Sequence, residues 1–538
     1  TVANYAVMNP LWKGSTISVV DGNLKVTESS SSGSGVSGTI AVSSGKYYWE
    51  MTVLGVDGTN GYPRLGVGAF VDQTAANLFL MFLNWRPDGT ITNGGSAYFS
   101  VSISSPTTTF TTNDILQVAL DMDNNKIWFG KNNTWLASGN PATGANPTAT
   151  TSGTNILPTT GIYTSSSIVA FNFGQRPFAY NPPSGYVALN TYNLPTPIIQ
   201  QGNLYMDASI YTANGGVQTV TNTAGFKPDL VWTKTRSIVG SNYLMDSNRG
   251  ASKDLYSNLT NAEVTDANYI TAFNSNGFSI GTSNYANGTT MVGWQWQAGQ
   301  GTTSSNTSGS ITSTVSVSTT AGFSIVTYTG TGANATVGHG LGVAPKMIIV
   351  KNRGDAGQGW LVYHTSLGAT QYIILNSTAA AGTASTPWNN TAPTSTVFSV
   401  GTSGSSNESG FNLVAYCFAE IAGFSKFGSY TGNGSTDGPF VYLGFRPKYL
   451  MIKRTDSTGS WELIDSVRSP YNATANTLYA NLSVAEDVGT GSGYYPTDFV
   501  SNGYKIRGDS VSAGYNANGG TYIYAAFAEN PFNNANAR

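Results

Sequence analysis

Two histidines, one cysteine and a repeated set of acidic and basic residues are the side chains of this 538-residue chain that could do chemistry. A Ser-His-Asp arrangement needs a base, and His339 and His364 are the only histidines. His339 lies in a Gly-His-Gly sequence typical of a turn, and His364 stands about where related segments carry Asp246 or Asp465. A single cysteine, Cys417, excludes an intrachain disulfide framework and a Cys-based zinc site, and it reads as a small buried side chain. We therefore expect no catalytic residue, no metal site and no cofactor.

Glycoside hydrolysis needs two carboxylates about 5–10 Å apart. The candidate pairs are Asp246 with Glu263 and Asp465 with Glu486. However, Arg249 and Arg468 follow the two aspartates at the same spacing, which predicts a repeated ion pair that orders a loop. Tandem duplication of one constellation fits a structural role better than catalysis. We expect a protein that is not an enzyme, with a polysaccharide depolymerase as the minor alternative.

The segment 121–125 resembles the first ligands of an EF-hand calcium loop, with Asp, Asp and Asn at alternate positions. Lys126 stands where that loop needs glycine, and Asn132 stands where it needs a bidentate glutamate. Asn and Asp also tolerate the positive φ of a tight turn. We therefore predict a β-hairpin with strands at 115–121 and 126–129.

The composition favours an all-β fold. Aromatic residues make up 12% of the chain, and the 63 glycines and 21 prolines are too frequent for long helices. Segments such as 47–53 combine aromatic and β-branched residues between turn residues, as strands do. Short helices are expected at most in the stretches 255–263 and 478–486. The apolar run 78–83 is too short for a membrane helix and fits a buried strand.

The charge balance limits the class of partner. Lys and Arg total 25 against 27 Asp and Glu, which gives a net charge of −2. Nucleic acids and anionic membranes demand clustered Lys and Arg, so we expect neither as the main partner and no membrane insertion. The N-terminus lacks a basic region followed by an apolar core, so no signal peptide is expected. The profile fits an extracellular or particle-surface protein better than a metabolic enzyme.

The chain repeats itself after residue 190. Each repeat has a Tyr-Thr pair, a proline seventeen residues after that tyrosine and a lysine six residues after the proline: Tyr211, Pro228 and Lys234; Tyr328, Pro345 and Lys351; Tyr430, Pro447 and Lys453. This spacing predicts repeat 1 (191–300), repeat 2 (322–422) and repeat 3 (423–538), each about 100 residues and each a β-sandwich, jelly-roll-like, with its own core. The Gly-, Ser- and Thr-rich segment 301–321 is predicted to be a linker.

The segment before the repeats (1–190) resembles SPRY domains. The motifs are KYYWE at 46–50, PRLGVG at 63–68, VALD at 118–121, KIWF at 126–129, Trp135 and VAFNFGQRPF at 169–178. They follow the family's order and spacing across about residues 8–185. The resemblance implies a two-sheet β-sandwich in which most Trp and Phe residues are core, and which binds protein partners through loops at one end.

The arrangement of an SPRY-like region followed by repeats is similar to virion proteins of tailed bacteriophages. The strings that carry this likeness are GLGVAPKMIIVK at 340–351, GSYTGNG at 428–434, GFRPKYLMIKR at 444–454 and AFAENPF at 526–532. The resemblance implies a virion location, on the tail or the head, and other virion proteins as partners.

Two functions follow from this setting. In the first, the chain is a tail fibre or adhesin that binds a host-surface glycan or protein multivalently, with exposed Trp and Tyr stacking on sugar faces. In the second, it is a structural head fibre or a capsid or tail decoration without receptor binding. We expect a homotrimer, assembled through domain faces because the sequence lacks heptads and Gly-X-Y repeats. The receptor-contacting residues cannot be named from the sequence.

Overall fold

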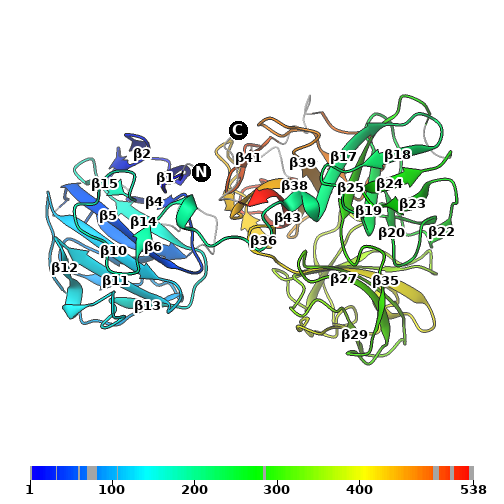
Figure 1. Ribbon diagram of the computed structural model, residues 1–538, viewed down its shortest axis with the longest axis horizontal. Coiled ribbons are helices and arrows are strands. Elements are labelled where there is room, and N and C mark those ends of the chain that lie inside the picture. The colour runs from blue at the N-terminus through cyan, green and yellow to red at the C-terminus, as the bar shows by residue number, and fades with distance from the viewer. Residues whose placement is uncertain are drawn as a thin grey trace. The chain divides into compact units, whose positions relative to one another are not determined.

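The computed structural model describes residues 3–31, 33–57, 61–69, 82–105, 107–282, 286–488, 496–508 and 514–531. Nearly all of the regular structure is β, as predicted. The chain divides into two compact units, the N-terminal unit (1–196) and the C-terminal unit (197–538) (Figure 1). The polar tail 533–538 and most of the apolar run 78–83 lie outside the described residues.

The N-terminal unit contains two sheets. One has, in spatial order, β1 (Met8–Lys13), β4 (Ser34–Gly38), β14 (Ile156–Ile162), β6 (Arg64–Ala69), β7 (Phe82–Trp85) and β8 (Ile91–Thr92). The other has β2 (Ile17–Val20), β3 (Lys25–Glu28), β15 (Ile168–Asn172), β5 (Lys46–Gly55), β10 (Ile115–Asp121), β11 (Lys126–Lys131), β13 (Ala149–Thr151) and β9 (Phe99–Val101), with β12 (Thr134–Trp135) beside β11 and β16 (Val187–Ala188) beside β5.

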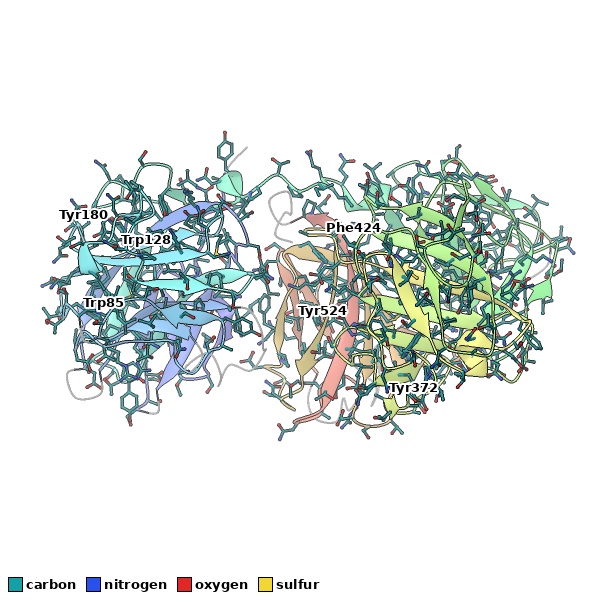
Figure 2. All side chains as sticks on the ribbon, turned by 90° about the horizontal axis from the view of Figure 1, so that it is seen from below. Trp85, Trp128, Tyr180, Tyr372, Phe424 and Tyr524 are labelled. Atoms are coloured by element: carbon teal, nitrogen blue, oxygen red, sulfur yellow. The ribbon has the colours of Figure 1, made fainter. Side chains whose placement is uncertain are left out.

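The aromatic residues of the SPRY-like motifs form the interior of this unit. Trp49 on β5, Trp85 on β7 and Trp128 on β11 are fully buried. Figure 2 labels Trp85 and Trp128 in this unit. The Trp85 ring stacks on Phe129 with centroids 6.3 Å apart. Burial of such large rings contributes on the order of 2–3 kcal/mol per side chain, so these residues stabilise the unit and do not face a ligand.

The predicted hairpin is confirmed. Strands β10 and β11 pair with Asp121 opposite Lys126, and Asn125 has a φ of 57° in the turn. The Asp121 carboxylate accepts hydrogen bonds from the backbone N–H groups of Asp123 and Asn124 and lies 3.0 Å from Lys46 Nζ. Donors within the protein therefore bond the Asp121 carboxylate, which would be the first ligand in a calcium loop.

The C-terminal unit has three sets of sheets, one for each repeat. Repeat 1 has β17 (Met206–Thr212), β25 (Thr290–Trp296), β19 (Leu230–Thr235), β20 (Tyr243–Asp246), β21 (Lys253–Tyr256) and β22 (Val264–Thr265), and separately β18 (Gln218–Thr221), β24 (Gly277–Ile280) and β23 (Ile270–Asn274). Repeat 2 has β28 (Phe323–Thr329), β35 (Asn412–Phe418), β30 (Met347–Asn352), β31 (Leu361–His364), β32 (Gln371–Ile374) and β33 (Gly382–Thr383), and separately β29 (Ala335–Gly338) and β34 (Val397–Val400). Repeat 3 has β36 (Ser425–Thr431), β43 (Thr521–Pro531), β38 (Phe445–Arg454), β39 (Trp461–Asp465) and β40 (Leu478–Tyr479), and separately β37 (Phe440–Tyr442), β42 (Gly503–Ile506) and β41 (Thr497–Val500).

The main sheets share one strand order. In each repeat the opening strand pairs with the closing strand, which pairs with the strand that carries the repeated lysine. Two further strands follow in repeat 3 and three in repeats 1 and 2. The registers also agree, since Leu230 faces Asp246, Met347 faces His364 and Tyr449 faces Asp465. The internal repetition predicted from spacing is therefore confirmed.

The predicted linker 301–321 is wrong in part. Within it, β26 (Ser304–Asn306) and β27 (Ser313–Ser318) extend the main sheet of repeat 2 through β28. Val315 and Val317 alternate with Ser and Thr, so one side of β27 packs on the apolar cluster of repeat 2. The segment was predicted to be a linker because its overall composition is polar, although its apolar residues alternate with polar ones as in a strand.

The stretches 255–263 and 478–486, where the sequence permits short helices, are not helical. They begin as the short strands β21 and β40 and continue without helical structure. The described residues contain one α-helix, α1 (Gly404–Asn407), and three 3-10 turns at Leu136–Ser138, Thr191–Asn193 and Gly202–Leu204. Within the part of the chain that the structure describes, none of the helices has the length and hydrophobicity that a membrane span requires.

The expectation of one separate core per repeat is wrong in part. A single apolar cluster takes residues from all three repeats, while repeats 1 and 2 keep smaller clusters of their own. At the shared core, the equivalent rings of Trp296, Phe418 and Phe527 contact one another, with centroids 5.8–6.4 Å apart. Because successive strand residues point to opposite faces, each main sheet packs on its own repeat with one face and on the shared core with the other.

Candidate functional site

The two predicted ion pairs are present. Arg249 Nε lies 2.5 Å from Asp246 Oδ2, and Arg468 Nε lies 2.6 Å from Asp465 Oδ2. All four side chains are fully buried. Each arginine also bonds a backbone carbonyl of its own repeat, Leu244 in repeat 1 and Leu463 in repeat 3. The pairs therefore close the turn after the fourth strand of the sheet.

Glu263 and Glu486, the glutamates of the two candidate hydrolytic pairs, belong to the same clusters. Arg249 Nη1 donates to Glu263 Oε2 at 2.9 Å, and Arg468 Nη1 donates to Glu486 Oε1 at 2.8 Å. In repeat 1 a guanidinium thus joins the two carboxylates that hydrolysis would need separate. Burial opposes the charge of Arg249, but the adjacent Asp246 and Glu263 raise its pKa.

Sequence reasoning missed the partners that neighbouring repeats supply. The Tyr416 hydroxyl of repeat 2 donates to Asp246 Oδ2 of repeat 1 at 2.8 Å. Trp294 Nε1 of repeat 1 donates to Asp465 Oδ2 of repeat 3 at 2.9 Å. Tyr416 and Trp294 hold the same position on the closing strands β35 and β25. The recurrence of an aromatic residue with a hydrogen-bond donor at this position of the repeat was the sequence signal that could have identified them.

A second pair of contacts joins the same repeats. Arg353 of repeat 2 makes a bidentate contact with Glu263, with Nε–Oε2 2.8 Å and Nη2–Oε1 2.9 Å. Arg236 of repeat 1 donates to Glu486 of repeat 3, with Nε–Oε2 2.9 Å. Burial would raise the pKa of Glu263, but the hydrogen bonds from Arg353 and Arg249 lower it.

His364 fills the equivalent position in repeat 2. Its Nε2 lies 3.1 Å from the carbonyl oxygen of Tyr524 in repeat 3, and its Nδ1 accepts from the backbone N–H of Ser366. These contacts assign a neutral ring protonated on Nε2. Burial lowers the pKa of His364 to about 4. The ring is therefore a neutral contact between repeats.

His339 and Cys417 are buried as well. His339 Nε2 lies 3.2 Å from the carbonyl oxygen of Thr394, and Nδ1 accepts from the Leu341 N–H. Burial lowers the pKa of His339 and raises that of the Cys417 thiol. Neither group is placed to meet a substrate, because both side chains are inaccessible to solvent.

The three repeated lysines are also inaccessible. Lys234, Lys351 and Lys453 are fully buried, and burial lowers the pKa of each to about 8. Their ammonium groups donate to backbone carbonyls; Lys351 reaches Thr260 of repeat 1 at 2.9 Å and Lys453 reaches Thr378 of repeat 2 at 3.4 Å. They satisfy carbonyl groups where two repeats meet.

The described residues expose few aromatic side chains. All eleven tryptophans lie among the described residues, ten are buried, and the remaining one, Trp135, is only half-buried. The expectation of exposed tryptophans for sugar stacking is therefore wrong, because these side chains pack in the apolar interiors of the two units. Tyr192 and Tyr471, exposed by 72% and 79%, are the most exposed aromatic side chains described.

A surface groove in the N-terminal unit is a second candidate contact region. It has a volume of about 800 Å³ and is lined by Ser102, Ile103, Ser104, Thr107, Thr108, Ala137, Asn146 and Pro147. None of these side chains is charged. By contrast, the void among Trp296, Phe418 and Phe527 in the shared core is about 20 Å³, room for about one water molecule.

No group of three or more His, Cys, Asp or Glu side chains within the described ranges could hold a metal ion. The structure thus brings the predicted site residues together in pairs and joins them to neighbouring repeats.

A family model described as "Domain of unknown function (DUF7483)" matches residues 201–531, which is more than half of the chain. The chain belongs to this family. The DUF7483 match covers all three repeats, and its description names no activity. No curated protein is significantly similar to the chain.

Two solved structures with similarity to this chain are SPRY domains. The SPRY domain of human HERC1 is 21% identical to this chain, with a TM-score of 0.22. The match covers 32% of this chain and 99% of the HERC1 domain. A human SPRY domain is 13% identical with a TM-score of 0.24, and covers 31% of this chain and 99% of its own.

Proposed function

We propose that this DUF7483 protein is a non-enzymatic component of a tailed-bacteriophage particle that binds the host cell surface, as a tail fibre or adhesin. The groove of the N-terminal unit carries the proposal. Its exposed side chains are hydroxyls, an amide and small apolar groups, which suit the hydroxyl-rich and uncharged surface of a glycan. The sequence resemblance to phage virion proteins supplies the setting.

The buried polar clusters support a non-enzymatic role. Asp246 and Asp465 are the carboxylates best placed by sequence for catalysis, and both are fully buried against arginine. A glycosidase needs carboxylates that reach the scissile bond from opposite sides. Incubation with host capsule, lipopolysaccharide and exopolysaccharide should release no new reducing ends. Release that Asp465→Ala abolishes without unfolding would replace the proposal with a depolymerase.

Binding is tested on the purified full chain. Immobilised host polysaccharide should retain it, and Ser104→Ala and Thr108→Ala should each weaken retention about two- to tenfold, the effect of one lost neutral hydrogen bond. Thr134→Ala, on β12 outside the groove, is the matched control and should bind as the wild type does. Equal binding by all variants would remove the groove from the proposal.

Weak single sites become useful when several act together. We propose that copies assemble as homotrimers on the virion beside other virion proteins, which multiplies the effective concentration of binding sites. Light scattering on the purified chain gives its mass directly. A monomeric mass at micromolar concentration would contradict autonomous trimerisation.

The alternative is a structural decoration of head or tail. It is favoured by the C-terminal unit, in which the buried charged side chains described above bind one another or the backbone. Particles labelled with antibody against the chain separate the two locations. Loss of the protein with unchanged host adsorption would favour decoration.

A further inference from the structure

The three repeats meet at three junctions with the same backbone geometry. In each, a backbone N–H beyond the fifth strand of one repeat donates to a carbonyl that follows the lysine strand of another. The bonds are Glu263 N to Arg353 O at 2.7 Å, Glu486 N to Arg236 O at 2.8 Å and Ala381 N to Thr455 O at 2.9 Å. Repeat 2 therefore docks on repeat 1, repeat 1 on repeat 3 and repeat 3 on repeat 2, which closes a ring (Figure 1).

A second set of equivalent contacts repeats this direction. The donor in each contact is a side-chain N–H of the residue four positions before Asp246, His364 or Asp465. It bonds the backbone carbonyl at the equivalent position of the neighbouring repeat. The contacts are Trp360 Nε1 to Tyr256 O at 2.8 Å, Trp461 Nε1 to Ile374 O at 3.0 Å and Asn242 Nδ2 to Tyr479 O at 2.9 Å. The junctions are thus head-to-tail contacts of one kind, which close after three copies.

The side chains at these junctions are of two chemical types. On repeats 1 and 3 the accepting face carries an Asp-Arg-Glu triad, and the docking repeat offers an arginine and an aromatic N–H or O–H donor. On repeat 2 the same three positions are His364, Leu367 and Ala381. Repeat 3, which docks there, has Thr455 for the arginine and Ala525 for the aromatic donor.

The replacements match on both sides of the third junction. Ala525 has no donor to offer, and His364 instead bonds the neighbouring Tyr524 carbonyl. Thr455 brings no charge to Ala381. Two junctions therefore carry an arginine–glutamate ion pair, and we call them ionic. At the third junction these positions hold Thr455 and Ala381, and we call it neutral, although all three backbones meet in the same way.

We propose that these side chains fix the cyclic order of the repeats, so that each docking face accepts one class of neighbour and refuses the other. Three repeats with head-to-tail contacts can close in only two orders. In the order not observed, repeat 3 would dock on repeat 1 and leave Glu263 without a neighbouring arginine. Repeat 1 would dock on repeat 2 and set Arg236 against Ala381. Half-paired buried charges penalise that order.

A swap at constant composition tests the proposal in the full chain. The donor swap, Arg353→Thr with Thr455→Arg, places threonine against Glu263 and arginine against Ala381. The full swap adds Glu263→Ala and Ala381→Glu, and so moves the arginine–glutamate pair between repeats to the other junction without changing the composition. Unfolding by urea is followed by tryptophan fluorescence, with Trp294 and Trp296 as buried reporters.

The donor swap should raise the unfolded-to-folded ratio at fixed urea about tenfold or more, and the full swap should recover most of that loss. If the donor swap does not fold, Ala381→Glu alone is compared with Ala381→Glu and Thr455→Arg together, and the second variant should be the more stable. A full swap no more stable than the donor swap, or no rescue by Thr455→Arg, would overturn the proposal.

Discussion

The ionic junction of repeat 2 on repeat 1 and the neutral junction of repeat 3 on repeat 2 share a backbone geometry and differ in chemistry. Glu263 and Ala381 donate the same backbone bond, but only Glu263 adds a bidentate contact with an arginine. A junction can therefore form without the arginine–glutamate pair, from backbone bonds, the shared apolar core and the side-chain hydrogen bonds of His364, Trp461 and Lys453. The charges add selectivity to a contact that does not need them.

The largest expected effect is the loss of stability on substitution of Arg249, compared with the loss at the equivalent position of the neutral junction. Arg249→Met should cost about 3–5 kcal/mol in the free energy of unfolding, because it leaves Asp246 and Glu263 buried without their common guanidinium. Leu367→Met, the equivalent position at the neutral junction, should cost less than about 1.5 kcal/mol. Urea titration of both variants checks this. Similar losses would mean that the triad contributes only its volume.

The neutral junction should respond to acid through His364. Its folded pKa of about 4 lies below the ordinary 6.5, so its contribution is complete above pH 6.5 and is lost as the pH falls toward 4. The loss should reach about 3 kcal/mol. His364→Gln keeps an amide donor and should remove this part of the pH dependence. A variant with the wild-type profile between pH 6.5 and 4 would contradict the assignment.

The ionic side has a titrating group with the opposite sign. Both carboxylate oxygens of Asp254, on β21 of repeat 1, are buried, and no hydrogen-bond partner exists for them among the described residues. Burial raises the pKa of Asp254 from 3.8 to about 7. Its stabilisation is present below pH 4 and is lost as the pH rises through 7.

Asp254→Asn should therefore be more stable than the wild type by about 2 kcal/mol at pH 8 and nearly equal to it at pH 4. Thermal unfolding at the two pH values measures this. Asp266→Asn, a neighbouring carboxylate that raises the pKa of Asp254, is the matched control and should give a smaller gain. Equal stability of Asp254→Asn and wild type at pH 8 would show that burial of the ionised Asp254 carboxylate does not destabilise the protein.

The smallest expected effect is the loss of stability on substitution of one of two arginines near the ends of the lysine strands, Arg353 in repeat 2 and Arg454 in repeat 3. Arg353→Ala should cost about 1–2 kcal/mol, because its bidentate contact is partly buried. Arg454→Ala breaks a contact with Asp456, which is more exposed, and should cost at most about 1 kcal/mol. Raised salt should shrink the second effect more than the first. The reverse ranking would contradict the junction role of Arg353.

Patterns that are local in sequence were predictable. The hairpin at Asp121, the repeat spacing and the Asp246–Arg249 pair all depend on residues a few positions apart or on a constant interval. The neighbours that complete the clusters were not, since Tyr416 lies 170 residues from Asp246. The shared core was missed for a related reason. A strand buried on both faces looks the same whether the second face meets its own repeat or another, so neither the core nor the burial of the tryptophans could be read from periodicity.

The contact between Arg236 and Glu486 spans 250 residues of chain. Repeat 1 leaves the ribosome long before its partner exists, because synthesis at about 5–20 residues per second delays Glu486 by about 10–50 seconds. During that interval the apolar side of Trp294 and Trp296 has no cover from repeat 3. Contacts this distant in sequence also form slowly. Newly made chains should therefore depend on protection from aggregation until the last strand, β43, is complete.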